Sequence, residues 1–390
     1  MKISIVVGGR FHAFDLAQYL NEKQVLETLI TSYPKFYIKK NYKKINLEKV
    51  QSIISKELIN RSFGKIDFLN SLFNINDFSS KYFRKRACEL IAYNEIDILL
   101  GWSGFSLESF KRAMSFNCLK VLERGSSHIL HQYEILKEEY NLIGLKPLLP
   151  TKKNIDIEKQ EYEIADHIMV PSQFAKDTFI KRGFHFSRVS KVPYGVDLKM
   201  FKSNNKKLHD KDPKFRIIYT GSLSVRKGII YLLSAFCELN LKNSELILVG
   251  NIENNIKKKI SKFLDHENVT YHSAKSQSEL NDYYVNSDLF ITCSIEEGLA
   301  MVQVQAMACG LALISTENSG GRELIEEGHN GYITPIRNIE YLKNKILYLY
   351  NNRDELREMG KNSQKKALSF FSWDNYGSEV LKTYDLILKK

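Results

Sequence analysis

Two loops in the second half of the chain combine glycine turns with charged side chains. The first, Thr220–Gly228, follows an apolar run and carries the adjacent cations Arg226 and Lys227. Two cations beside a glycine turn can balance the charge that grows on a departing diphosphate. A Lys-Gly pair at a helix start also fits ordinary solvated charge, so this loop alone leaves both interpretations open.

The second loop, Ser294–Met301, leads from a buried strand through a glycine turn into a helix expected over Val302–Cys309. Backbone N–H groups at a helix start lack partners within the helix and favour an anion, most naturally a phosphate. Glu297 stands at the rim of the turn, where it can accept hydrogen bonds from sugar hydroxyls or simply complement the helix dipole. The adjacent Glu296 does not form a glycosidase pair with it, because consecutive side chains point apart.

A third glycine loop, Gly8-Gly9-Arg10-Phe11-His12, follows the first apolar run. It lacks the G-x-G-x-x-G spacing, so the dinucleotide fingerprint is absent. Gly8 and Gly9 would let the backbone approach a phosphate closely, or they form a plain tight turn. His12 and Asp15 are candidates for contact with an acceptor, although Asp15 is equally compatible with a helix-surface charge.

No convincing metal cluster or nucleophilic triad is found in the sequence. Asp210-Lys211-Asp212 is a D-x-D string, but it lies in a polar stretch and is interpreted as solvated charge. The five cysteines are scattered without a C-x-x-C pair and are interpreted as reduced packing residues. A G-x-S-x-G elbow is also absent.

The elements around these loops indicate an α/β protein. Its 390 residues, 43% hydrophobic and 26% charged, predict two domains. Short apolar runs alternate with amphipathic helical stretches, as in α/β units around parallel sheets. The predicted strands are Ile3–Val7, Asp97–Leu100, Leu119–Leu122, Ile168–Val170, Arg216–Thr220, Leu246–Val249, Val269–Tyr271, Leu289–Cys293 and Leu311–Ser315. Lys191–Asp197 and the polar stretch Lys202–Lys214 are interpreted as the interdomain linker. Two such domains leave a cleft at the carboxyl ends of their strands, where ligands bind.

The order and spacing of the motifs resemble glycosyltransferase family 4, retaining enzymes of the GT-B fold that use nucleotide-activated sugars. The matching segments are Glu158–Phe174, Val192–Asp197, Gly221–Gly228, Ser294–Gly310 and Ser319–Gly331. The resemblance implies two Rossmann-like doubly wound domains facing a central cleft. Residues 1–195 would bind the acceptor and residues 196–372 the nucleotide-sugar donor. A helix over about 373–390 would pack back on the first domain.

The resemblance also assigns roles to residues. The implied catalytic residues are Glu297 on the donor sugar, Lys227 and Arg226 on the diphosphate, and His128 near the reacting sugar, with His131 as the rival of His128. The implied donor-binding residues are Gly8, Gly9, Gly221, Ser222, Gly298, Leu299, Ala300, Met301, Gln305, Gly250 and His272. Two positions depart from the family pattern: Gln305 replaces a glutamate that usually holds the ribose, and Ser222 replaces an arginine. We therefore expect weaker or altered nucleotide binding.

The implied function is transfer of a hexose from a UDP- or GDP-sugar to a glycan or lipid-linked acceptor in surface polysaccharide or lipopolysaccharide synthesis. The resemblance implies no cofactor and no metal, since protein cations would replace it. A nucleotide-sugar epimerase of the same fold and a noncatalytic sugar-nucleotide-binding partner are the alternatives. Turnover of nucleotide-sugars would separate the three.

The charge and the hydropathy of the sequence indicate where in the cell the protein is expected. The net charge is +12, and residues 1–200 hold 31 Lys and Arg against 22 Asp and Glu. Tyr33–Lys44 and Lys81–Arg86 mix aromatic residues with cations, which suits either an anionic membrane surface or a solvated helix. No nucleic-acid-binding motif accompanies them, so nucleic acid is not an expected partner. No stretch approaches the roughly 18 apolar residues of a membrane span, and we expect a cytoplasmic protein, with peripheral attachment to the membrane as an option.

Overall fold

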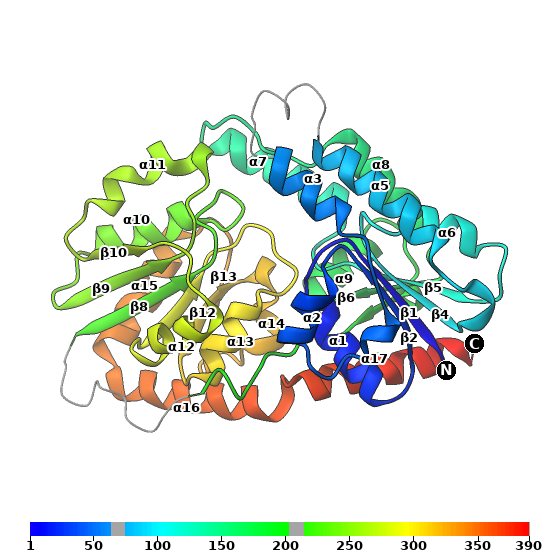
Figure 1. Ribbon diagram of the computed structural model, residues 1–390. Coiled ribbons are helices and arrows are strands. Elements are labelled where there is room, and N and C mark those ends of the chain that lie inside the picture. Colours follow the sequence, from blue (N-terminus) through cyan, green and yellow to red (C-terminus); the bar gives the residue numbers. More distant parts are fainter. Residues whose placement is uncertain (64–74, 203–213, 390) are drawn as a thin grey trace.

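The computed structural model describes residues 1–63, 75–202 and 214–389 and consists of two α/β domains side by side (Figure 1). The first contains a seven-stranded parallel sheet in the order β3-β2-β1-β4-β5-β6-β7. Its strands are β1 (Ile3–Val7), β2 (Leu26–Thr31), β3 (Val50–Ser52), β4 (Ile98–Trp102), β5 (Leu119–Glu123), β6 (His167–Val170) and β7 (Val189–Lys191). Its helices are α1 (Ala13–Glu22), α2 (Lys35–Asn41), α3 (Ser55–Phe63), α5 (Ile75–Glu89), α6 (Leu107–Ala113), α7 (Ile129–Leu142), α8 (Lys152–Ile164) and α9 (Gln173–Ile180).

The second domain contains a six-stranded parallel sheet in the order β10-β9-β8-β11-β12-β13. Its strands are β8 (Phe215–Thr220), β9 (Ser244–Val249), β10 (Val269–His272), β11 (Leu289–Thr292), β12 (Ala312–Thr316) and β13 (Gly331–Thr334). The helices that follow β8 are α10 (Ile229–Leu239), α11 (Asn254–Leu264), α12 (Gln277–Val285), α13 (Met301–Ala308), α14 (Gly321–Leu324), α15 (Ile339–Asn351), α16 (Arg353–Phe370) and α17 (Trp373–Leu388). Short 3-10 helices lie at Leu47–Lys49, Tyr93–Glu95, Phe186–Arg188 and Glu317–Ser319.

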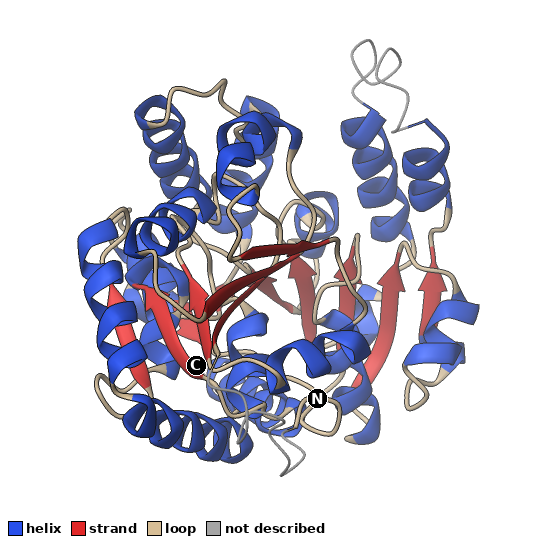
Figure 2. Cartoon of the chain, turned by 90° about the vertical axis from the view of Figure 1, so that its left-hand side faces the viewer, coloured by secondary structure: helices blue, strands red, loops and turns tan. Residues whose placement is uncertain are grey.

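Helices cover both faces of each sheet, so the strands are buried on both sides (Figure 2). In β1, Ile3, Ile5 and Val7 pack on one face of the sheet and Val6 packs on the other. This is why β1 appears in the sequence as a continuous apolar run instead of an alternating one. The predicted pair of Rossmann-like domains is confirmed.

The last helix, α17, lies against the first domain although it follows the second one in sequence (Figure 1). It packs on α1, and the absent side chain of Gly377 leaves room for the ring of Tyr19. Where the chain returns, Val196 N–H donates to the carbonyl oxygen of Phe371 at 2.9 Å. The two domains are therefore joined by two neighbouring segments.

All nine predicted strands are present, with ends that differ by at most two residues. Four further strands, β2, β3, β7 and β13, were not predicted. β3 and β7 are three-residue edge strands, and β2 is interrupted by the polar residues Glu27 and Thr28. Among the described residues, no helix is long and apolar enough to cross a bilayer.

Candidate active site

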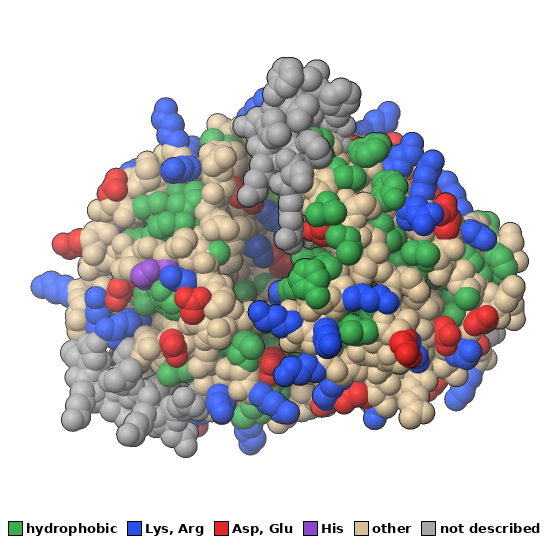
Figure 3. Space-filling view, viewed as in Figure 1, with side chains coloured by type: hydrophobic (Ala, Val, Ile, Leu, Met, Phe, Trp, Pro, Cys, Tyr) green, Lys and Arg blue, Asp and Glu red, His purple; other side chains and the backbone are tan. Residues whose placement is uncertain are grey.

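A cavity of about 560 Å³ lies between the two domains, where the carboxyl ends of both sheets meet. Figure 3 shows the hollow between the two halves of the molecule. The first domain lines it with Phe11, His12, Trp102, Ser103, Arg124, Gly125, Ser126 and Tyr194. The second domain lines it with Thr220, Gly221, Arg226, Lys227, Gln277, Leu280, Glu297, Leu299, Ala300, Met301, Val302 and Gln305. Most of the predicted site residues thus come together at one place.

The loop between β8 and α10 places its two cations at the cavity wall. Gly228 has a left-handed backbone with φ of +60°, and a Cβ there would lie 2.0 Å from the carbonyl oxygen of Cys293. Only glycine therefore fits the tight approach of this loop to the end of β11. This approach brings Arg226 and Lys227 next to the loop that carries Glu297.

Glu297 forms ion pairs with both cations. Its Oε1 lies 3.2 Å from Nη2 of Arg226, and its Oε2 is paired with Nζ of Lys227. Burial disfavours the ionised carboxylate, but the two cations outweigh burial and lower the pKa of Glu297. Glu297 is consequently ionised and can accept hydrogen bonds from ligand hydroxyls.

Glu296 faces the other way and connects the two domains. Its Oε1 accepts hydrogen bonds from the Ser126 hydroxyl and from the backbone N–H (3.0 Å) and hydroxyl (2.7 Å) of Ser127. Its Oε2 accepts from Nε2 of Gln132 and from Nε of Arg226, each at 2.9 Å. Burial alone would raise the pKa of this fully buried carboxyl, but Arg226 and the serine hydroxyls hold the pKa well below its usual range.

The sequence did not predict this role of Glu296. The carboxylate of Glu296 holds the guanidinium of Arg226 in position. Nε of Arg226 donates to Glu296, while Nη2 lies close to Glu297 and Ser126. A buried carboxylate with five hydrogen-bond donors around it, four of them from the first domain, also stabilises the contact between the domains.

The glycine turn before α13 contacts the first domain directly. A Cβ on Gly298 would lie 2.2 Å from the carbonyl oxygen of Gly125, so the backbones of the two domains touch here. No side chain caps the start of α13, and Leu299, Ala300 and Met301 line the cavity. The start of this eight-residue helix therefore faces the cavity without a protein cap, as an anion site requires.

Gln305 lies in the cavity wall, where the resemblance implied the ribose contact. Its Oε1 accepts a hydrogen bond from the hydroxyl of Tyr284 at 3.2 Å, and that hydroxyl also lies 2.7 Å from Oγ1 of Thr220. The side chain of Gln305 is thus held in place by the hydroxyl of Tyr284, which Thr220 fixes in turn.

His12 is the histidine of the first domain that lines the cavity. Its Nε2 lies 3.2 Å from Oε1 of Glu123, and its ring packs on Tyr194 with centroids 4.0 Å apart. Oε2 of Glu123 is buried and lacks a hydrogen-bond partner among the described residues. Glu123, the last residue of β5, was not predicted as a site residue, because in the sequence it only ends a largely apolar strand.

His128 does not reach this cavity, contrary to the prediction. It precedes α7, and its Nδ1 accepts a hydrogen bond from the N–H of Leu130 at 3.2 Å. Its ring packs between Tyr162 and Phe179 and lines a separate cavity of the first domain. Burial lowers the pKa of His128 to about 3. A lone histidine after a strand is here a helix cap and a packing residue.

The rival, His131, does not line the central cavity either. Its ring packs edge-on against Phe174, and its buried Nε2 has no hydrogen-bond partner among the described residues. The loop after β5 thus reaches the cavity through Arg124, Gly125 and Ser126, but neither His128 nor His131 lines it. His12, which does, had been considered only for contact with the acceptor.

Several predicted donor-binding residues lie behind the cavity wall instead of in it. Gly8 and Gly9 face the rings of Phe105 and Phe11, and Gly250 packs on the carbonyl of Gly221. The residues concerned are Gly8, Gly9, Ser222, Gly250, His272 and Gly298. They shape the loops that surround this cavity.

No group of three or more His, Cys, Asp or Glu suited to a metal occurs in the described part of the chain. Asp210-Lys211-Asp212 falls outside the described residues. All five cysteines are free, and Cys118, Cys293 and Cys309 are buried.

Comparison with known proteins gives partial sequence matches. Spore coat protein SA of Bacillus subtilis is 29% identical over 181 residues, 43% of this chain and 48% of that protein. The capsular polysaccharide biosynthesis glycosyltransferase CapM of Staphylococcus aureus is 27% identical over 238 residues, which are 58% of this chain and 61% of that protein. Lipopolysaccharide 1,2-N-acetylglucosaminetransferase of Salmonella typhimurium is 28% identical over 239 residues, which are 55% of this chain and 61% of that protein. The chain spans about half to three fifths of the length of these relatives.

Solved structures match over the whole chain. Sucrose-phosphate synthase from Thermosynechococcus elongatus superimposes with a TM-score of 0.77 at 16% identity, covering 100% of this chain and 99% of that one. HepE from Anabaena, solved with UDP and glucose, gives a TM-score of 0.68 at 16% identity, covering 99% of both chains. These likenesses establish the two-domain GT-B fold. Residues 200–366 match the family model described as glycosyl transferases group 1.

Proposed function

We propose that this protein is a glycosyltransferase that uses a nucleotide-sugar as donor. One observation carries the proposal: Arg226, Lys227, Glu297 and the uncapped start of α13 converge on a single cavity between the domains. Two cations and helix N–H groups suit a diphosphate, and an ionised carboxylate beside them suits sugar hydroxyls. The match of residues 200–366 to the group 1 family supports the same conclusion.

In the proposed reaction, the bond between the anomeric carbon and the diphosphate oxygen breaks, and its electron pair leaves on the diphosphate. The oxygen of an acceptor hydroxyl forms the new bond to the anomeric carbon, and the hydroxyl proton leaves with the diphosphate. Arg226 and Lys227 stabilise the charge that develops on the leaving group, and this stabilisation is stronger in the transition state than in the ground state.

We further propose that the reaction retains the anomeric configuration, that the sugar is a hexose carried by UDP or GDP, and that no metal is needed. Retention rests on the resemblance of Gly221–Gly228 and Ser294–Gly310 to the family 4 motifs. The acceptor is a glycan or a lipid-linked glycan of a surface polysaccharide or lipopolysaccharide, a choice supported by the names of the capsular and lipopolysaccharide relatives.

Turnover tests the proposal. The protein is incubated with UDP-, GDP- and dTDP-sugars, with and without a membrane extract, and nucleotide release is measured. Release that depends on the extract supports transfer, an epimerised sugar supports an epimerase, and binding without release supports a noncatalytic partner. Proton NMR of the product gives the anomeric configuration, and equal rates with and without EDTA are expected.

Peripheral attachment to an anionic membrane is proposed for the surface around α2. Phe36 is 76% exposed, and Lys35, Lys39, Lys40, Lys43 and Lys44 are exposed around it. Figure 3 shows cationic side chains gathered on this side of the first domain. Each cation near an anionic leaflet contributes about 1 kcal/mol.

The second candidate segment, Lys81–Arg86, is less suited to a membrane than expected, because Phe83 and Arg84 are buried. Vesicle flotation distinguishes the two segments. Phe36→Ser combined with Lys39→Glu should abolish binding to anionic vesicles at low salt, whereas Lys85→Glu should leave binding nearly unchanged. Absence of binding by the wild-type protein would refute attachment.

A further inference from the structure

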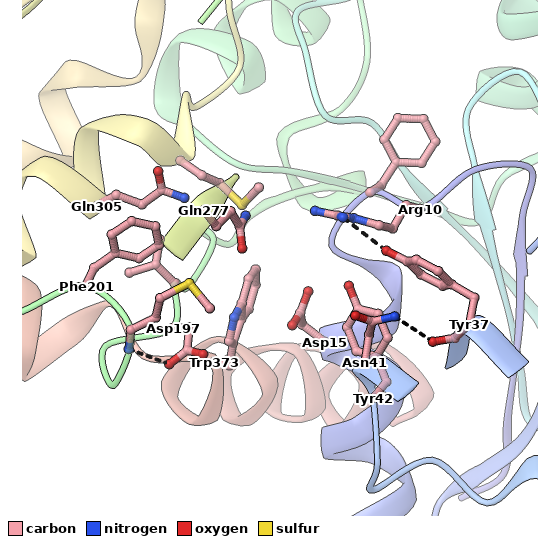
Figure 4. A pocket seen from close by; sticks show the side chains of 14 residues that line it. Arg10, Asp15, Tyr37, Asn41, Tyr42, Asp197, Phe201, Gln277, Gln305 and Trp373 are labelled. Atoms are coloured by element: carbon pink, nitrogen blue, oxygen red, sulfur yellow. Dashed lines mark hydrogen bonds between the residues drawn. The ribbon is translucent and has the colours of Figure 1, made fainter. Parts of the chain in front are cut away.

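A cavity of about 450 Å³ lies in the first domain, between the start of α7, the second half of α8 and the turn after α9. Within the described part of the chain it shares no lining residue with the central cavity. The smaller cavity of about 200 Å³ in Figure 4, in contrast, shares Phe11, Gln277, Met301 and Gln305 with the central one and belongs to the candidate active site. The separate cavity has the size of a ligand pocket but no part in the proposed transfer.

His128 presents a hydrogen-bond donor to this separate cavity. Its Nδ1 accepts a hydrogen bond from the N–H of Leu130 at 3.2 Å, so the proton of the neutral ring is on Nε2. His128 is only 3% exposed, and Nε2 has no hydrogen-bond partner among the described residues, although the atom is not sealed in the interior. Because the ring lines this cavity, the Nε2–H group is an unused donor that opens on it.

Three cations line the same cavity. Lys159 lies on α8, and Lys181 and Arg182 follow the end of α9. In the described ranges neither lysine has a hydrogen bond or an ion pair, whereas Arg182 pairs with Glu134, which is not a wall residue. Glu163 is the carboxylate of the described wall, which therefore carries three positive charges against one negative charge.

The turn after α9 places aromatic surface beside these cations. Gly183 has a left-handed backbone with φ of +88°, so the chain reverses directly after the two cations. The N–H of Phe184 then donates to the carbonyl oxygen of Phe179 at 3.3 Å. The rings of Phe184 and Tyr162 both line the cavity, with centroids 6.0 Å and 4.9 Å from that of His128.

The charges of the cavity favour an anion with several acceptor oxygens. Burial is the main cause of the lowered pKa of His128, and the positive charges of Arg182 and Lys159 lower it further. The ring is therefore a neutral N–H donor within a positive field. A phosphate monoester has three acceptor oxygens and a charge of about −1.5 to −2 near pH 7, which two unpaired lysines can balance.

We propose that this cavity is a second ligand site, separate from the active site, and that it binds a phosphate monoester. Nε2–H of His128 and the ammonium groups of Lys159 and Lys181 donate to the phosphate oxygens, and the rings of Tyr162 and Phe184 face the organic group that carries the phosphate. A soluble phosphate ester and a lipid headgroup both offer these oxygens. The site does not depend on the proposed function.

Isothermal titration calorimetry tests the site with defined probes, in the presence of saturating UDP. The probes are inorganic phosphate, glycerol 3-phosphate, glucose 6-phosphate and, below its micelle concentration, dihexanoyl phosphatidic acid, with glycerol and glucose as neutral comparisons. We expect at least one phosphate ester to bind, and the double variant Lys159→Ala/Lys181→Ala to bind it at least about tenfold more weakly. Tighter binding of the phosphatidic acid than of glycerol 3-phosphate assigns the ligand to a lipid, and the reverse order assigns it to a soluble ester; both orders support the site.

Matched variants separate this site from general effects of charge and folding. Lys152→Ala removes an exposed lysine of α8 outside the cavity wall, so the affinity should change less than about twofold. His128→Asn keeps a side chain that can cap α7 but removes Nε2, so it should also weaken binding. In protein labelled with ¹⁵N-histidine, the Nε2 resonance that this variant lacks should shift when phosphate is added to the wild-type protein.

The proposal is overturned if no phosphate ester binds, if the neutral probes bind as tightly, or if the double lysine variant binds like the wild type. Binding that is lost in Lys227→Ala instead would place the phosphate in the central cavity and would also overturn it. Phosphate binding that depends on Lys159 and Lys181, in a protein without any nucleotide-sugar turnover, would support the site and refute only the proposed function.

Discussion

Replacement of Glu296 by glutamine tests whether the two adjacent glutamates, Glu296 and Glu297, have different roles. An amide oxygen can replace Oε1 and keep the three hydrogen bonds from Ser126 and Ser127. The amide nitrogen then faces the donors Nε2 of Gln132 and Nε of Arg226, each of which was 2.9 Å from Oε2. Each of the two lost bonds to the charged group is worth about 1.5–3 kcal/mol, so Glu296→Gln should lower the free energy of unfolding by about 3–6 kcal/mol.

Urea denaturation followed by tryptophan fluorescence measures this loss, and Glu297→Gln is the matched control. Glu297 pairs with Arg226 and Lys227, and within the described part of the chain its side chain has no hydrogen bond or ion pair with the first domain. We expect Glu297→Gln to cost about 1–2 kcal/mol of stability while reducing transfer more than about tenfold. Equal losses of stability for the two variants, or a loss below about 1 kcal/mol for Glu296→Gln, would refute the proposed interdomain role of Glu296.

Three further predictions follow from the site and its surroundings. Lys227→Ala should reduce nucleotide release at least about tenfold, or about 1.4 kcal/mol, and should lower the melting temperature because the carboxylate of Glu297 loses one of its two cations. A near-normal rate would contradict the role of Lys227 on the diphosphate. The pKa of His128 falls from 6.5 to about 3 on folding, so protons bind the unfolded chain first and stability is lost as the pH falls below about 6.5. Between pH 7.5 and pH 5 this loss is about 2 kcal/mol by urea titration, and His128→Asn, which keeps a capping side chain, should remove it. Gly298→Ala places a Cβ 2.2 Å from the carbonyl oxygen of Gly125, so it should hold the domains apart, increase the radius of gyration in X-ray scattering and weaken UDP binding; an unchanged radius would argue against this contact in solution.

The fold and the donor loops could be predicted from sequence because their signals are local. Glycine turns, a pair of cations and buried apolar strands all fall within a few residues of one another, as in Thr220–Gly228. Short edge strands such as β3 were missed because three residues carry too little pattern.

Pairings across long sequence separations were not predictable. Glu296 meets Ser126 and Ser127 across about 170 positions, and nothing in its own loop indicates that its side chain points to another domain. His128 was assigned to the cleft because it follows a strand end, but the start of α7 turns its ring into the first domain. The direction of a side chain at a strand-to-helix junction depends on one or two backbone angles, which residue type does not reveal.

The packing of α17 on α1 makes the first domain discontinuous in sequence. Tyr376, Val380 and Tyr384 are buried in the core shared with α1, so the surface of α1 that they cover stays exposed until α17 has been synthesised. The strands and intervening helices of the second domain, from 215 to 334, can assemble as a continuous unit before then. During synthesis the first domain would therefore be completed after the second one, and the apolar surface of α1 would stay exposed to water until then.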